Sequence, residues 1–300
     1  MPGFWTHIIA GKQIIDKLQQ PTLKNILENN QKIYNFGCQG PDFLYFNNFW
    51  PWLKDKTGNK AGGELHGDDI KPLFISGVDF IKKEYSTDHF NQIISYFCGF
   101  ISHFVVDILF HKNILKKVKN SEEHIGLETK LDSYLVKKLW NKEVSLLDTR
   151  KSIDIGKELP DYIEQFYKNI LTLRTNYNLN LGYISDSYHD FKLFLRITAT
   201  PGFFKRKIFD IINLFAPWDI KRIIYPPQTN MPVFPEKIER EFNQILSRAV
   251  KISGEIITDI YNYLIYRIKE SELQSVLGDY QKRLEGQVVK KKELPQIAGL

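Results

Sequence analysis

The sequence is poor in cysteine. Cys38 and Cys98 are the only two in 300 residues, too few for a disulfide framework. A cysteine-based zinc site would also need more of them at close spacing. Any metal bound by this chain must therefore use histidine, aspartate and glutamate as ligands.

Long apolar stretches are also scarce. The longest, Ile94 to Phe110, spans about 17 residues, short of the roughly 20 that a transmembrane helix needs. It contains His103 and Asp107, so we interpret it as a buried helix whose polar groups need partners. The segment Met1 to Lys12 has no positive n-region, apolar h-region or small-residue cleavage site, which predicts a cytoplasmic protein.

Convincing strand patterns and internal repeats are missing, which predicts an all-α protein built as a single multi-helix domain. We assign residues 1–285 to this domain and residues 286–300 to a flexible basic tail. Helix-like apolar spacing runs through 7–19, 68–84, 89–118, 124–139, 159–176, 203–215 and 235–269. Turn-forming residues predict breaks at 37–42, 57–67, 121–123, 177–190 and 225–235.

The net charge of +6 suits a phosphate-bearing substrate or an anionic surface. The basic clusters at 116–119, 205–207 and 290–292 are scattered along the chain, however, and we interpret them as solvated faces.

A polar stripe runs along the apolar helix predicted around residue 103. With 3.6 residues per turn, His103, Asp107 and His111 fall within about 80° of one another. Burying a carboxylate and two imidazoles without partners is costly, and a bound metal removes that cost. Neutral imidazole and ionised carboxylate are preferred ligands of Zn²⁺.

The spacing of this stripe indicates more than one metal. His103 and His111 are about 12 Å apart along the helix axis, too far to share one ion comfortably. Asp107 lies midway, and its two oxygens suit a bridge between ions roughly 3.5–4 Å apart.

Further candidate ligands lie nearby in the sequence. His124 and Glu128 form a pair at i and i+4, on one face of the next predicted helix. His7, Asp42 and His66 each lie in or beside a predicted loop or helix end. His89 is interpreted as a helix start and His189 as part of a polar loop, so neither is included. The eight candidates are His7, Asp42, His66, His103, Asp107, His111, His124 and Glu128.

The order of these residues resembles the bacterial zinc-dependent phospholipase C family, whose members are all-helical phosphodiesterases with three zinc ions in one cleft. The resemblance extends through residues 1–130 and rests on Thr6-His7, Gly40-Pro41-Asp42, His66, Ser102-His103, Asp107, His111 and His124 to Glu128.

The resemblance implies a ligand set and a reaction. Asp42, His66, His103 and Asp107 would surround one zinc, and Asp107 would also reach a second zinc held by His7. The set His111, His124 and Glu128 would hold the third. The family reaction is attack of a metal-activated water on a phosphodiester, with Asp42 in the position of the general base. We therefore expect two to three zinc ions.

The chain departs from the toxic, secreted members at both ends. Those members ligate zinc through a processed N-terminal tryptophan, whereas this chain starts Met1-Pro2, with Trp5 two residues before His7. The occupancy of the His7 site is therefore left open. No strand pattern follows residue 270, so the lipid-binding β-sandwich of those members is not expected.

Two aromatic segments bear on the substrate. Phe43 to Trp52 packs six aromatics into ten residues, which suits either a lipid-tail or base-stacking pocket or the closure of the core under a loop. Pro201 to Phe209 sets aromatics beside three cations, in the pattern of either a membrane-surface helix or an ordinary amphipathic one.

Three functions fit the sequence. The first is a metal-dependent phosphodiesterase acting on a phospholipid or a related phosphodiester, with peripheral membrane contact. The second is a single-strand nuclease or nucleotidase of the related trinuclear-zinc fold, which alone would bind nucleic acid. The third is a non-catalytic helical module stabilised by its metals.

Overall fold

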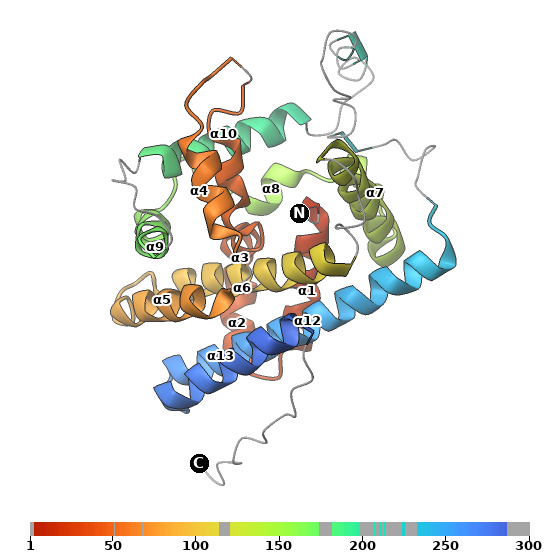
Figure 1. The fold of residues 1–300 in the computed structure, drawn as a ribbon. Helices are drawn as coiled ribbons and strands as arrows, with labels where there is room; N and C mark the ends of the chain where they lie inside the picture. The colour runs from red at the N-terminus through yellow and green to blue at the C-terminus, as the bar shows by residue number, and fades with distance from the viewer. Residues whose placement is uncertain are drawn as a thin grey trace.

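The computed structural model describes residues 3–50, 52–67, 69–113, 121–173, 182–198, 207, 210–211, 213, 224–225 and 233–286 (Figure 1). These residues form helices and no β-strand, which confirms the predicted all-α fold. The first part contains α1 (Phe4–Lys17), α2 (Pro21–Asn29), α3 (Gln31–Gly37), the 3₁₀ helix η1 (Gly40–Phe46), α4 (Thr57–Leu65), α5 (Ile70–Lys83) and α6 (Phe90–Asn113). The second contains α7 (Ser121–Trp140), η3 (Val144–Leu146), α8 (Thr149–Ile153), α9 (Asp161–Leu171), α10 (Gly182–Thr198), α12 (Glu236–Leu264) and α13 (Glu270–Leu284).

Helix α6 runs through the middle of the fold, with α1, α3, α5 and α12 packed around it (Figure 1). It is long and apolar enough to cross a membrane, but its apolar window is entirely buried within the protein. Its closest neighbour is α3, because a Cβ on Gly99 would lie 2.2 Å from the Tyr34 carbonyl oxygen. The predicted buried helix is therefore the core of the molecule, and its polar side chains lie inside it.

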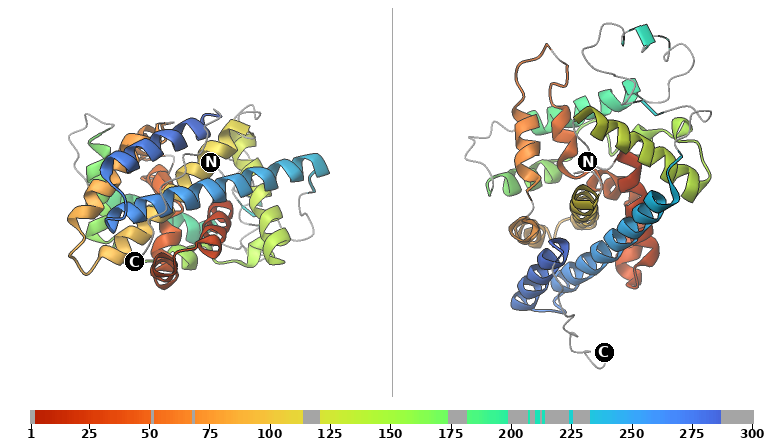
Figure 2. Two further views of the ribbon diagram at one scale, coloured as in Figure 1. Left: turned by 90° about the horizontal axis from the view of Figure 1, so that it is seen from below. Right: turned by 45° about the vertical axis from the view of Figure 1, so that its right-hand side comes forward.

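Helices α12 and α13 form an antiparallel pair across one side of α6 and α5 (Figure 2). The prediction of one helix over 235–269 was wrong at its end, because α12 stops at Leu264. Tyr266 adopts a left-handed backbone with φ of 61°, and the Arg267 amide donates to the Asn262 carbonyl at 2.7 Å. This turn returns the chain into α13, which the apolar spacing did not predict.

Three predicted breaks are helical instead. The shortest, 121–123, forms the first turn of α7, and the other two are longer segments. Residues 57–67 contain α4, whose glycines allow close packing on η1: a Cβ on Gly58 would lie 2.5 Å from Asn47 Cβ. Residues 177–190 contain the start of α10, so His189 lies on a helix and pairs with Glu158 at 2.8 Å rather than lying in a loop. In both segments tertiary packing outweighs weak helix propensity.

The other predicted helices agree with the structure to within a few residues where it describes them. The predicted helix 203–215, the aromatic-basic segment 201–209 and the tail 286–300 lie almost entirely outside the described residues.

Candidate metal centre

The stripe predicted on α6 is present. His103 is fully buried, Asp107 is 8% exposed, and the side chain of His111 is 41% exposed at the end of the helix. The three side chains therefore lead from the core to the surface along one helix face.

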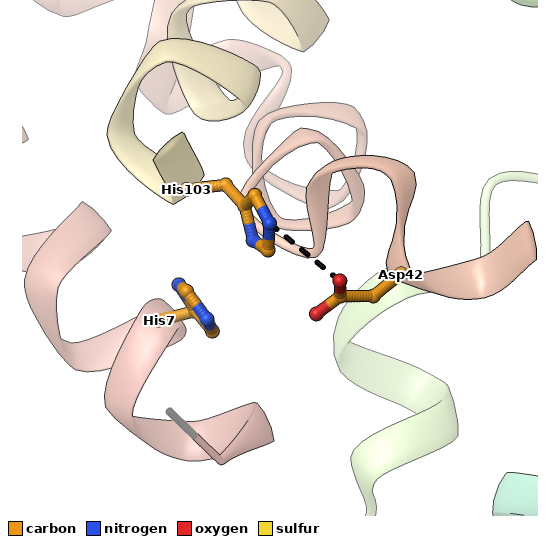
Figure 3. Close-up of side chains that lie close together, drawn as sticks. All are labelled: His7, Asp42 and His103. Atoms are coloured by element: carbon orange, nitrogen blue, oxygen red, sulfur yellow. Dashed lines mark ion pairs between the residues drawn. The ribbon is translucent and has the colours of Figure 1, made fainter. Parts of the chain in front are cut away.

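A first group joins three elements at the inner end of this stripe. His7 from α1, Asp42 from η1 and His103 from α6 offer ligand atoms that all lie within 4.8 Å of one another (Figure 3). The His7 and His103 rings stack with centroids 4.5 Å apart, and His103 Nε2 lies 3.6 Å from Asp42 Oδ1. The sharp bend that starts η1 allows this approach, because Gly40 has φ of +54° and a Cβ there would lie 2.2 Å from the His103 ring.

A second group combines His66, His103 and Asp107, again within 4.8 Å, so His103 belongs to both groups. His66 follows α4, and its Nδ1 lies 2.7 Å from the Gly62 carbonyl oxygen. Its Nε2 lies 2.8 Å from Asp42 Oδ1 and 3.3 Å from His103 Nε2. A backbone carbonyl on one ring nitrogen fixes the tautomer of a metal-binding histidine and leaves the other nitrogen free to ligate.

The remaining candidates lie between α6 and α7. His111 Nε2 is 3.3 Å from Asp107 Oδ1, and His124 Nε2 is 2.7 Å from Glu128 Oε1. The His111 and His124 rings lie 5.1 Å apart. The structure thus brings all eight predicted side chains into one continuous cluster.

The protonation of the cluster suits cation binding. Burial lowers the pKa of His7 to about 3 and that of His103 well below its ordinary value, so both imidazoles are neutral and able to ligate. Burial acts to raise the pKa of Asp107, but the hydrogen bond from His111 and the nearby positive charges together outweigh it, so the pKa is lowered. Burial raises the pKa values of Asp42 and Glu128.

The polar atoms themselves fit a metal. His7 is 1% exposed, and neither of its ring nitrogens has a hydrogen-bond partner among the described residues. Burying an imidazole without hydrogen bonds costs folding free energy unless its nitrogens bind a ligand. Zn²⁺ is bound by this combination of neutral imidazoles and carboxylates.

Comparison with known families agrees with this site. Residues 6–177, more than half of the 300-residue chain, match the family described as zinc dependent phospholipase C. The chain belongs to the zinc-dependent phospholipase C family. Searches of curated proteins and of solved structures returned no match. All eight candidate ligands lie within the part that matches the family, whereas α10, α12 and α13 lie beyond it.

One buried carboxylate was missed from the sequence. Asp132 Oδ1 accepts hydrogen bonds from the backbone N–H and hydroxyl of Thr6, both at 2.7 Å, and Oδ2 accepts from the Trp5 N–H at 2.9 Å and the Tyr225 hydroxyl at 2.7 Å. It thereby ties the first turn of α1 to α7. The signal was available, since Asp132 continues the four-residue spacing of His124 and Glu128.

A cavity of about 270 Å³ opens beside the candidate metal centre. Asp42 and Glu128 form part of its wall, and its apolar lining comes from several elements. Those apolar residues are Phe4, Phe46, Ile125, Leu147, Phe191, Phe194 and Leu195.

The aromatic segment 43–52 is divided between the core and the wall of this cavity. Phe43 is fully buried in the core, whereas Phe46 lines the cavity. Trp50 and Trp52 stack at 5.0 Å, and Trp52 is 68% exposed.

Proposed function

We propose that this protein is a zinc-dependent phosphodiesterase that hydrolyses a phospholipid or a closely related phosphodiester. The observation that carries the proposal is the continuous cluster of five histidines and three carboxylates, centred on His103, with an apolar cavity beside it. We assign all eight candidate side chains as ligands of two to three zinc ions.

The side chains of the cluster have different proposed roles. His7 and His103 present neutral nitrogens toward the cluster, His66 lies against Asp42, and Asp107 lies between the inner and outer groups. Bound zinc would supply a water of lowered pKa and positive charge for the phosphoryl oxygens. The surrounding buried side chains hold these groups in place and exclude bulk water, which strengthens each electrostatic contact.

Asp42 is the proposed general base. It lies beside His66 and His103, it also lines the cavity, and burial raises the pKa of its carboxyl group. A raised pKa makes the carboxylate a better proton acceptor near neutral pH. A general base in the cavity wall would lie next to the phosphodiester group that the metals would bind.

Peripheral contact with a membrane completes the proposal. The stacked pair Trp50 and Trp52 projects indole surface into solvent beside Lys54 and Lys56. Exposed tryptophan with neighbouring lysine suits the interface of a lipid bilayer.

The test compares substrates on zinc-loaded protein. We expect release of a phosphate-monoester head group from phosphatidylcholine and loss of that release in Asp42→Asn even when it is assayed in excess zinc. Cleavage of single-stranded DNA in place of phosphatidylcholine would favour a nuclease. If neither substrate nor a bis-aryl phosphodiester is cut, the protein is a metal-stabilised module and the enzymatic proposal fails.

A further inference from the structure

The cavity beside Asp42 has a wall that the family match does not include. Phe191 and Phe194 lie on α10, beyond residue 177, and both line the cavity. Their rings pack against Phe46, with centroids 4.8 Å and 4.6 Å apart. This part of the cavity wall is therefore supplied by residues outside the region that matches the family.

The charge of the lining argues against an anionic occupant. The described lining residues include no lysine or arginine, and their three carboxylates are Asp42, Glu128 and Asp132. Nucleic acids are bound largely through cations placed against their phosphates. The part of the cavity that the structure describes therefore suits an apolar group better than a nucleotide chain.

Three hydroxyls of the lining have partners, and a fourth has none that the structure describes. The hydroxyls of Thr129 and Thr198 donate to carbonyls one turn earlier in their own helices, and the Tyr225 hydroxyl donates to Asp132. Thr149 is 4% exposed, and its hydroxyl has no partner among the described residues. A buried hydroxyl in a cavity wall is suited to a ligand acceptor such as an ester carbonyl.

We propose that the cavity binds one ester-linked acyl chain of a phospholipid, with its methylenes against Phe46, Phe191 and Phe194 and its ester carbonyl accepting from Thr149. This inference rests on the proposed function, since it names the part of the substrate held beside the metals. The volume of about 270 Å³ lies just below the ~300 Å³ at which drug-sized sites begin, which suits one short chain rather than two.

Chain length tests the apolar wall. On monomeric substrates, each methylene added in the cavity should raise kcat/KM about fourfold. Dihexanoyl-phosphatidylcholine should then exceed dibutyroyl-phosphatidylcholine by roughly fifteenfold, for two methylenes in one chain. Phe194→Trp fills the cavity and should reduce this ratio below about threefold. The control is Leu193→Trp on the same helix, because Leu193 is 39% exposed and should leave the ratio unchanged.

The ester contact has its own test. Wild-type protein should prefer the dihexanoyl ester over the matched dihexyl ether by about fivefold, the effect of one neutral hydrogen bond. Thr149→Val removes the hydroxyl and should abolish that preference, whereas Thr149→Ser should retain it. Equal preference in wild type and Thr149→Val would overturn the assignment of this residue.

Calorimetric binding of dihexanoylglycerol to zinc-free protein separates the two proposals. If no phosphodiester is cleaved but wild type binds the diglyceride and Phe194→Trp does not, the proposed function fails and the acyl site stands. If phosphatidylcholine is cleaved without chain-length dependence, the acyl site is overturned and the function stands. Displacement of the diglyceride by a single-stranded oligonucleotide would also overturn it.

Discussion

The imidazole rings of His7 and His103 stack 4.5 Å apart at an interplanar angle of 26°, although one lies in the first turn of α1 and the other in the middle of α6. Two parallel imidazoles attract each other little, and His7 has no described hydrogen-bond partner. The pairing is explained if both nitrogens face a common cation.

Removing His103 should therefore cost more zinc than removing His7. His103 belongs to both three-residue groups, whereas His7 belongs to one. We expect His103→Asn to lose at least one more zinc ion per chain than His7→Asn, measured by elemental analysis after dialysis. Equal losses in the two variants would show that the groups do not share His103.

The zinc-free protein should become less stable in acid because of His7. Burial lowers its folded pKa to about 3, whereas its unfolded value is 6.5, so unfolding takes up a proton between these values. Stability is thus lost as pH falls from 6.5 toward 3, with a slope of up to about 1.4 kcal/mol per pH unit. His7→Leu should reduce that slope in urea unfolding from pH 4 to 6.5. An unchanged slope in His7→Leu would contradict the assignment.

Asp132 should matter for both stability and metal binding. It accepts four hydrogen bonds, three of which join α1 to α7, and each of these helices carries candidate ligands. Asp132→Asn should destabilise the fold by about 2 kcal/mol, since bonds to a charged group are lost, and should weaken zinc retention against a chelator. Asp16→Asn, on the exposed side of α1, should change neither quantity. If Asp132→Asn retains zinc as well as the wild type does, Asp132 contributes to folding and not to metal binding.

Gly40 should tolerate no side chain. An added Cβ would lie 2.2 Å from the His103 ring, on a backbone with φ of +54°. Gly40→Ala should lower stability by more than about 1 kcal/mol and reduce zinc content. The matched control is Gly254→Ala in α12, where nothing lies within 4 Å and where alanine should stabilise the helix slightly. Unaltered zinc content in Gly40→Ala would mean that η1 does not position the centre.

Trp52 should contribute to vesicle binding. Trp52→Ala should weaken binding to phosphatidylcholine vesicles several-fold while leaving turnover of a monomeric substrate unchanged, because the indole is exposed and lies outside the cavity lining. Tyr266→Ala removes an equally exposed aromatic from the turn between α12 and α13 and serves as control. Equal binding of both variants would place the membrane contact elsewhere.

The sequence was sufficient where its pattern follows one helix. The α6 stripe and the His124–Glu128 pair lie on helix faces that the 3.6-residue period defines, so both were predictable. It also indicated His7, Asp42 and His66, but only through their order along the chain, since nothing local to these residues shows that α1, η1 and α4 converge on His103.

The sequence alone did not predict the structure where it depends on packing between helices. Gly58, Gly62 and Gly63 indicate a break, yet α4 forms because the absence of side chains lets it lie against η1. The polar start of α10 resembles a loop, yet this helix supplies Phe191 and Phe194 to the cavity. The cavity wall could therefore not be predicted before the helices were assembled, whereas the polar stripe on α6 could.

Zinc analysis of the purified wild-type chain, with titration back into chelator-treated protein, tests the central claim most directly. The eight clustered side chains predict two to three zinc ions per chain, at least one of them lost in His103→Asn. Fewer than two ions in the wild type, or a zinc content that His103→Asn leaves unchanged, would contradict the account.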